Sequence, residues 1–508
     1  MKMNNQDEAL RNRNAPLEMT SDEFREVGYQ VVDSIANLLD SLAQRPVTSN
    51  KSAKAIRSII ENEQMPQKGI TPGHLFEETT DLLFEHSLFN GHPRFWGYIT
   101  SSASPIGALS DLLAASVNPN VGAWTLSPMA TEIEVQTVRW IADLIGYPVT
   151  CGGLLVSGGN MANFVGFLAA RTSKVTWNIR EEGVGATNQH LVIYGSKETH
   201  TWIEKAVDLF GLGTKAMRWI DTDVNQQMDI NALEKQILSD QADGHLPFMV
   251  VGAAGTVSTG AVDPLLEIAT ICRKHDLWFH VDGAYGAPAA ALPEASAQLK
   301  GLKEADSVAL DPHKWLYAPL EAGCILVRNP QTLIDTFSSH PEYYNFGGDG
   351  EDSPLNYYEF GLQNSRGFRA LKVWLGFRQA GREGYIVMIR DDIALAEALY
   401  RLVDAHSELQ AITHNLSITT FRYVPNSLPQ DESETEVYLN ELNQELLNRL
   451  QSGGEVFVSN AVVDGKYVLR VCIVNFRTTL NDIEALPEIV IREGRKIDVE
   501  MRPEHLTN

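Results

Sequence analysis

SVALDPHKWLYAP, residues 307–319, and WFHVDGAYGA, residues 278–287, are the two stretches that decide the fold. Each opens with a short apolar run, which is typical of a buried strand, and then becomes polar or rich in glycine. The earlier run ends in Asp282, and the later run is followed by Lys314 between a histidine and a tryptophan. A buried carboxylate or amine must be paired with an opposite charge, be neutral, or serve in binding or catalysis, because desolvating an unpaired charge is strongly unfavourable. Asp282 and Lys314 are therefore the first candidate functional residues.

Apolar runs of the same kind alternate with helical patterns through the middle of the chain. They are residues 153–156, 190–194, 247–254 and 323–327. Near-continuous apolar strands separated by helices predict an α/β fold with a mainly parallel sheet that is covered on both faces. In such sheets ligands bind outside the carboxyl ends of the strands, which is where Asp282 and Lys314 are expected.

The two ends of the chain predict additional parts. Residues 21–42 have apolar side chains at helical spacing after a candidate cap at Ser21, and such a helix must pack on the main body or on a second subunit. Residues 45–75 are predicted to connect this helix to the body, and the tail is predicted to fray from Arg492. The expected domains are 1–93 (N-terminal, helical, dimer-packing), 94–384 (large, ligand-binding) and 385–508 (small, α/β).

The composition disfavours several classes of function. The formal net charge is −24, from 41 Lys+Arg against 65 Asp+Glu, which argues against binding to nucleic acid or to anionic membranes. No uncharged apolar run reaches the roughly 20 residues that span a bilayer, and the N-terminus has no signal-peptide core. The cysteines lack disulfide or zinc spacing, so we expect reduced thiols, no metal and a cytoplasmic protein. They are Cys151, Cys272, Cys324 and Cys472.

Asp282 and Lys314 carry complementary chemistry. A desolvated amine can form a Schiff base with a carbonyl, and a protonated pyridine nitrogen is a suitable partner for a buried carboxylate. Taken singly, each residue has a plain structural explanation: a lysine stem covers apolar surface, and an aspartate caps a helix. Their separation by a single strand-plus-helix step favours the functional interpretation.

Two further motifs complete a candidate site. VSGGNMANF, residues 156–164, places glycines between a strand and a helix, where backbone N–H groups suit a phosphate. No Gly-Lys-Ser/Thr follows and GxGxxG is absent, which disfavours a Walker A loop and a dinucleotide site. His200 follows another strand and is a candidate to stack on a ligand ring, although a lone histidine is more often structural.

With HPRFWGY (residues 92–98) and SPMATEIE (residues 127–134), these motifs make the chain resemble the group II pyridoxal-phosphate-dependent amino-acid decarboxylases. This family includes the aromatic L-amino-acid, histidine and glutamate decarboxylases, and the resemblance covers roughly residues 20–480. It implies the fold of the aspartate aminotransferase superfamily (fold type I), with a central sheet of the seven-stranded type. It also implies pyridoxal 5'-phosphate as the cofactor.

The resemblance implies a role for each residue of the cofactor site. Lys314 would hold the cofactor as a Schiff base, Asp282 would pair with its pyridine nitrogen, and His200 would stack over the ring. Asp311 stands where animal aromatic decarboxylases often carry Asn, and since an ionised carboxylate cannot donate to a phosphate, we expect it to cap backbone N–H groups. The other implied cofactor contacts are Gly159, Asn160 and His313 at the phosphate, Thr256 near the ring oxygen and Ala284 under the ring.

Tyr343 lies where decarboxylases of this family carry a loop tyrosine that protonates the substrate carbon after carbon dioxide leaves. Relatives with phenylalanine there tend to form aldehydes, so the resemblance implies decarboxylation to the amine. Tyr344 is adjacent, so the alignment is ambiguous by one residue, and either ring could instead pack the base of the loop. The expected catalytic residues are Lys314, Tyr343, His200 and Asp282.

The substrate is expected to be an aromatic L-amino acid, tyrosine-like before tryptophan-like. Ser365 stands where plant relatives carry serine with phenolic substrates, and Trp124 is expected to reach the pocket from the partner subunit of a homodimer with shared sites. The remaining candidate contacts form a mixed wall without a basic residue: Tyr98, Ile99, Thr100 and Ser101. The alternatives are an acidic amino-acid decarboxylase, an aldehyde-forming enzyme, an aminotransferase and a non-enzymatic scaffold.

Overall fold

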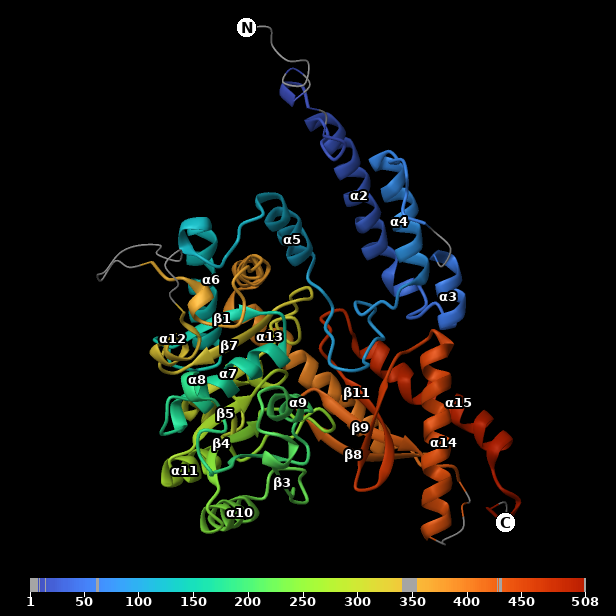
Figure 1. Cartoon of the computed structure of the whole chain (residues 1–508). Coiled ribbons are helices and arrows are strands. Elements are labelled where there is room, and N and C mark those ends of the chain that lie inside the picture. Colours follow the sequence, from blue (N-terminus) through green and yellow to red (C-terminus); the bar gives the residue numbers. More distant parts are fainter. Residues whose placement is uncertain are drawn as a thin grey trace. The chain divides into compact units, whose positions relative to one another are not determined.

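The computed structural model describes residues 8, 10–13, 15–60, 64–339, 354–426, 428 and 432–506. The chain divides into two compact units, Met1–Phe89 and Asn90–Asn508 (Figure 1). The further division that the sequence predicts near residue 384 stays a prediction. None of the helices in the described ranges is long and apolar enough to cross a bilayer.

The first unit is a group of helices: α2 (Ser21–Ser41), α3 (Ala53–Ile60) and α4 (Pro72–His86). α2 packs against α4. A capping box starts α2 at Thr20, whose hydroxyl accepts from the Glu23 N–H, so the cap predicted at Ser21 is shifted by one residue. The connecting segment predicted for residues 45–75 is wrong, because it contains α3 and the start of α4, where Pro72 occupies a first-turn position that tolerates proline.

The second unit contains a seven-stranded sheet in the order β1-β7-β6-β5-β4-β2-β3. β7 is antiparallel to both of its neighbours, and the other pairs are parallel, so the predicted mainly parallel sheet is confirmed. The strands are β1 (Gly152–Val156), β2 (Leu191–Ser196), β3 (Met217–Ile220), β4 (Leu246–Ala253), β5 (Trp278–Asp282), β6 (Ser307–Leu310) and β7 (Gly323–Val327).

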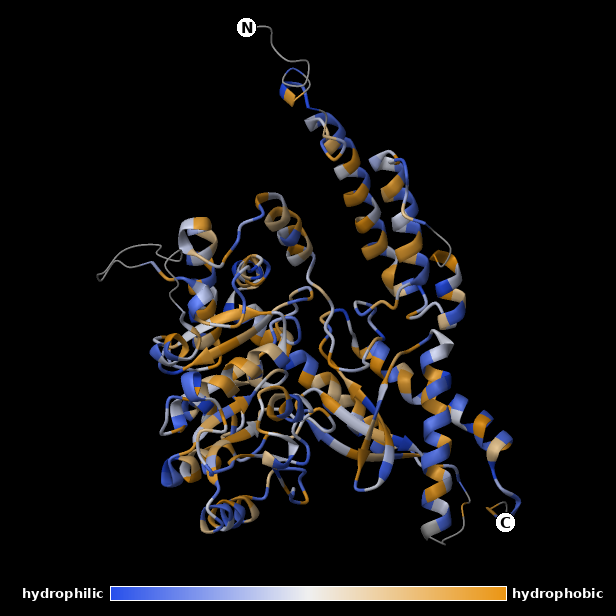
Figure 2. Cartoon of the chain, in the orientation of Figure 1, coloured by the Kyte–Doolittle hydropathy of each residue, from blue (hydrophilic) through white to orange (hydrophobic). Residues whose placement is uncertain are grey.

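Helices cover both faces of this sheet, as its apolar strands require (Figure 2). Successive side chains enter separate cores: Trp278 belongs to the core that includes residues of α7 and α9, whereas Phe279 belongs to the core that includes residues of α6, α10 and α11. The helices around the sheet are α5 (Pro105–Val117), α6 (Pro128–Leu144), α7 (Gly159–Lys174), α8 (Ile179–Glu182), α9 (Trp202–Leu209), α10 (Ile230–Ala242), α11 (Leu265–His275), α12 (Gln331–Phe337) and α13 (Ala370–Asp404).

A smaller antiparallel sheet, in the order β10-β11-β9-β8, follows α13. Its strands are β8 (Leu409–Asn415), β9 (Ile418–Tyr423), β10 (Ser459–Val463) and β11 (Lys466–Cys472). They pack with α14 (Glu432–Gly453) and α15 (Leu480–Met501) around a third core. The fraying predicted from Arg492 is wrong, because α15 continues to Met501 and buries Ile497.

Candidate active site

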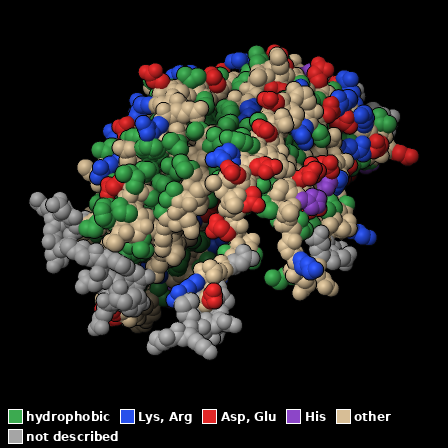
Figure 3. Space-filling view, turned by 90° about the horizontal axis from the view of Figure 1, so that it is seen from above, with side chains coloured by type: hydrophobic (Ala, Val, Ile, Leu, Met, Phe, Trp, Pro, Cys, Tyr) green, Lys and Arg blue, Asp and Glu red, His purple; other side chains and the backbone are tan. Residues whose placement is uncertain are grey.

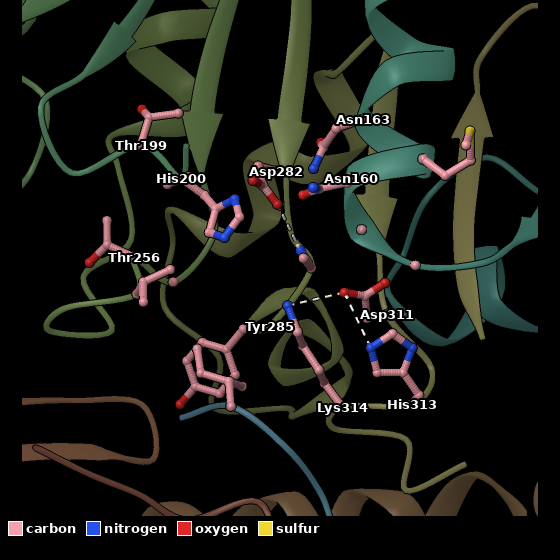
Figure 4. Close-up of a pocket in the computed structure, with 18 of the residues that line it drawn as sticks. Asn160, Asn163, Thr199, His200, Thr256, Asp282, Tyr285, Asp311, His313 and Lys314 are labelled. Atoms are coloured by element: carbon pink, nitrogen blue, oxygen red, sulfur yellow. Dashed lines mark hydrogen bonds and ion pairs between the residues drawn. The ribbon is translucent and has the colours of Figure 1, made fainter. Parts of the chain in front are cut away.

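A cavity of about 410 Å³ lies at the carboxyl ends of β1, β2, β4, β5 and β6 (Figure 4). This is the edge at which an open α/β sheet binds ligands. Ten of the residues that the sequence singles out line it: Ile99, Gly159, Asn160, His200, Thr256, Asp282, Ala284, Asp311, His313 and Lys314. Side chains that are far apart in the sequence therefore meet at one place.

Lys314 lies in the turn that follows β6, and its amine is held by a carboxylate. Its Nζ lies 3.0 Å from Oδ2 of Asp311, and Nε2 of His313 lies 3.7 Å from the same oxygen. Burial lowers the pKa of His313, and the Asp311 carboxylate opposes this shift. The capping role predicted for Asp311 is wrong, because its Oδ1 is buried without a hydrogen-bond partner in the described structure and its Oδ2 faces the amine.

The aromatic residues after Lys314 anchor its turn in the core. Trp315 stacks on Tyr285 with ring centroids 4.9 Å apart, and its indole N–H donates to Asp392 of α13 at 2.9 Å. The hydroxyl of Tyr317 donates to the same carboxylate oxygen at 2.7 Å. Burial raises the pKa of Asp392 to about 7, although these two donors oppose the shift. Sequence reasoning missed Asp392, for which the only signal was an acid on the apolar face of a helix.

Asp282 ends β5 and faces the cavity with both oxygens bonded to neutral donors. Oδ1 accepts from the Ala284 N–H at 3.1 Å, and Oδ2 accepts from the indole N–H of Trp202 at 2.8 Å. Among the described residues no cationic side chain forms a salt bridge with this carboxylate, which leaves it free to pair with a cationic ligand atom. Sequence reasoning also missed Trp202.

His200 lines the cavity near Asp282 (Figure 4). Its Nδ1 accepts from the Trp202 backbone N–H at 3.3 Å. Partial burial lowers the pKa of His200, and the Asp282 charge opposes this shift. The neutral ring therefore carries its proton on Nε2, because Nδ1 must accept.

The glycine turn before α7 has no room for a side chain at Gly159. A Cβ at Gly159 would lie 2.7 Å from Oδ2 of Asp311 and 3.4 Å from Cβ of Ala284. The helix begins at Gly159, so its first backbone N–H groups have no intrahelical partner and suit an anionic group. Asn160 lies in this first turn and lines the cavity.

The structure does not bring every predicted substrate contact to the cavity. Ser101 instead supports the turn after β6 that contains Lys314 (the lysine turn), because its hydroxyl donates to the His313 carbonyl at 2.8 Å. The indole N–H of Trp124 donates to Glu132 at 2.9 Å. Tyr343 and Tyr344 lie outside the described residues. The predicted contacts that do not line this cavity of the single chain are Tyr98, Thr100, Ser101, Trp124 and Ser365. Their contact with substrate stays a prediction.

Arg470 is a further residue that sequence reasoning missed. It lies on β11, is 3% exposed, and donates to Ser459 and to the carbonyl of Val257, which lines the cavity. Burial lowers its pKa. Across the described ranges no carboxylate pairs with this guanidinium, so it adds positive charge next to the site.

Comparisons with known proteins identify the family of the chain. Residues 54–424 match the family model described as the pyridoxal-dependent decarboxylase conserved domain. The aromatic-L-amino-acid decarboxylase of Bacillus atrophaeus is 34% identical over 468 residues, 92% of this chain and 94% of that protein. Tyrosine decarboxylase 2 of Arabidopsis thaliana is 32% identical over 466 residues, 89% of this chain and 83% of that protein. The crystal structure of Oryza sativa TDC with PLP and tryptamine matches with a TM-score of 0.88 at 26% identity, over 96% of this chain and 100% of that chain.

Proposed function

The chain belongs to the family of pyridoxal-dependent decarboxylases, and from this premise we propose that it removes the α-carboxylate of an aromatic L-amino acid, releasing the amine and carbon dioxide. The enzyme class is a carbon–carbon lyase. The observation that carries the proposal is the meeting of Lys314, Asp282 and His200 in a single cavity.

The cofactor of the family is pyridoxal 5'-phosphate, and the residues present fit it. The first backbone N–H groups of α7, which begins at Gly159, suit a phosphate, and Asp282 offers a carboxylate without a cationic partner among the described residues. Lys314 brings an amine into the same cavity. When bound, the cofactor supplies an electron-accepting ring, which stabilises the charge left on the substrate carbon as carbon dioxide departs.

We assign the chain's own residues the following work. Lys314 would hold the cofactor through its amine, and Asp282 would face the ring nitrogen and keep a proton there. His200, which lines the cavity, would cover one face of the ring and exclude water from it. Gly159, Asn160 and His313 hold the phosphate, while Thr256 and Ala284 bound the ring.

Tyr343 is proposed to return a proton to the α-carbon of the substrate. Its hydroxyl is a suitable donor for this step. The Nε2–H of His200 is the second candidate donor, because Nδ1 is occupied by the Trp202 N–H. A Tyr343→Phe variant that consumes dioxygen and releases aldehyde, ammonia and hydrogen peroxide in place of the amine would support the assignment to Tyr343.

The aromatic substrate class is supported by the lining and by the relatives. Among the described lining residues the basic side chains are Lys314, His200 and His313, so the lining offers no arginine to a side-chain carboxylate. Ile99, Tyr285 and Leu320 add apolar surface. The relatives above are named for aromatic amino acids and tyrosine. The order of tyrosine before tryptophan stays a prediction.

The test is an absorption spectrum of the purified protein, followed by mass spectrometry of the products from all twenty L-amino acids. A visible cofactor band with tyramine, phenethylamine or tryptamine is the expected result. γ-Aminobutyrate or β-alanine would contradict the aromatic substrate. Aldehyde with hydrogen peroxide, or a keto acid, would contradict simple decarboxylation.

We also propose a homodimer with shared active sites in the cytoplasm. α5 exposes more than half of four large apolar side chains, Leu109, Leu112, Leu113 and Val117, and hydrophobic side chains gather on one face of the molecule (Figure 3). Exposed apolar area of this kind is typical of interaction surfaces. The four described cysteines are free, which suits a reducing compartment. An active monomer in sedimentation experiments would contradict the dimer.

A further inference from the structure

Trp202 links the two side chains proposed to meet the ring of the cofactor. It is the first residue of α9 and is fully buried. Its backbone N–H donates to Nδ1 of His200 at 3.3 Å, and its indole N–H donates to Oδ2 of Asp282 at 2.8 Å. One residue therefore contacts both the group over the face of the ring and the group at its nitrogen.

The indole of Trp202 is itself held in one orientation. Its ring meets His280 edge to face, with centroids 5.8 Å apart. His280 is fixed by Ser307 and Asn163, each at 2.7 Å, and burial lowers the pKa of His280 to about 4, so this histidine is neutral. A fixed neutral support leaves the indole N–H directed at the carboxylate.

A hydrogen bond from this donor does two things for Asp282. It compensates part of the desolvation of a carboxylate that has no cationic partner among the described residues. With the Ala284 N–H on Oδ1, it also restrains the plane of the carboxylate, which lines the cavity and keeps lone pairs for a ligand there. Both effects would strengthen the contact between the Asp282 carboxylate and a pyridine nitrogen.

We propose that Trp202 is a positioning residue for the cofactor, which acts by holding Asp282 against the pyridine nitrogen. The inference rests on the role proposed for Asp282. If Trp202 served only for packing, its replacement should lower the affinity for every ligand of the cavity equally. If it positions Asp282, its replacement should lower the affinity only for ligands with a ring nitrogen.

Trp96 provides a matched control. It is also fully buried, and its indole N–H donates to a side-chain oxygen, that of Thr478, at 3.1 Å. This bond lies in the core of the smaller sheet and involves no cavity-lining residue. Trp96→Phe therefore removes the same donor and the same ring volume without changing Asp282.

The experiment measures the dissociation constants of full-length apoprotein for two compounds: pyridoxal 5'-phosphate, and its deaza analogue with CH in place of the ring nitrogen. Trp202→Phe should weaken the binding of pyridoxal phosphate about tenfold, which corresponds to about 1.4 kcal/mol. It should weaken the binding of the analogue less than about twofold. Trp96→Phe should change neither. Equal losses for both compounds, or equal losses in the two variants, would overturn the inference.

A second substitution keeps the test decisive if Trp202→Phe does not fold. Replacing Trp202 by benzothienylalanine retains the shape of the indole but removes its N–H, and the same selective loss is expected. The two affinities do not depend on the substrate. A wild-type protein that makes no aromatic amine would therefore reject the proposed function and leave this inference standing, while unselective losses in an active enzyme would do the reverse.

Discussion

Two buried carboxylates accept an indole hydrogen bond, and they differ in what surrounds them. Asp282 at the end of β5 accepts from Trp202, and it opens onto the cavity. Asp392 of α13 accepts from Trp315 and from the hydroxyl of Tyr317, and protein encloses it on every side at 1% exposure. The first carboxylate can still meet a ligand, whereas the second is committed to the core. Open space next to a satisfied carboxylate distinguishes a binding group from a structural one.

The largest expected effect separates the two carboxylates by activity. Asp282→Asn should lower kcat roughly 10²- to 10³-fold, because an amide cannot stabilise positive charge at the ring nitrogen. Asp392→Asn should lower kcat less than about tenfold, since Asp392 acts only through the lysine turn. Amine release is measured at saturating pyridoxal phosphate. Equal losses in the two variants would remove the distinction.

For stability the order should be the opposite, with the larger effect at Asp392. Asp392→Ala leaves an indole N–H and a hydroxyl without an acceptor in the core, and should lower the free energy of unfolding by about 3 kcal/mol or more. Asp282→Ala should lower it less, because water in the cavity can satisfy Trp202. Urea titrations of both variants check this. A larger loss of unfolding free energy for Asp282→Ala would contradict the distinction between an open and an enclosed carboxylate.

The pH dependence of stability should carry the signature of Asp392. Its pKa is raised from 3.8 to about 7 in the folded protein, so the folded state keeps a proton that the unfolded state releases. This group therefore favours folding below about pH 4, and its contribution falls as the pH rises to about 7. Asp392→Asn lacks this titration. Thermal midpoints of wild type and variant, measured between pH 4.5 and 7.5, should converge or cross as the pH rises, and parallel curves would contradict the assignment.

The smallest expected effect concerns one donor to Asp392. Tyr317→Phe removes the hydroxyl that lies 2.7 Å from the carboxylate and retains the ring. The indole of Trp315 still bonds the same oxygen, so the free energy of unfolding should fall by only about 1 kcal/mol. The midpoint of a urea titration measures this change, and a loss as large as that of Asp392→Ala would show that the two donors act as one unit.

The sequence predicted those parts of the site that follow strand ends. Asp282 and Lys314 were found because each interrupts an apolar run, and alternation of such runs with helices predicts a parallel sheet. The direction of β7 was beyond this reasoning, since its apolar pattern suits either direction. The connection from β6 to β7 contains the lysine turn and no crossover helix, which is why the two strands pair antiparallel.

Residues that act through other residues were missed. Trp202 and Asp392 sit in helical patterns, and their importance depends on which strand end or turn lies opposite them in the folded chain. Trp124 and Ser365 illustrate the reverse case, because a family pattern selects them although they do not line the cavity of the single chain. Local pattern identifies the groups at strand ends, and tertiary contact identifies what supports them.

The position of β1 has a consequence for how the protein is made. β1 is an edge strand, and among the described strands its one partner in the sheet is β7, which the chain reaches long after β1 has left the ribosome. At about 5–20 residues per second, β1 waits on the order of ten seconds or more for its partner. Throughout that time an apolar strand has an unpaired edge. Nascent chains that stop before Val327 should therefore depend on chaperones, and release from them should coincide with synthesis of β7.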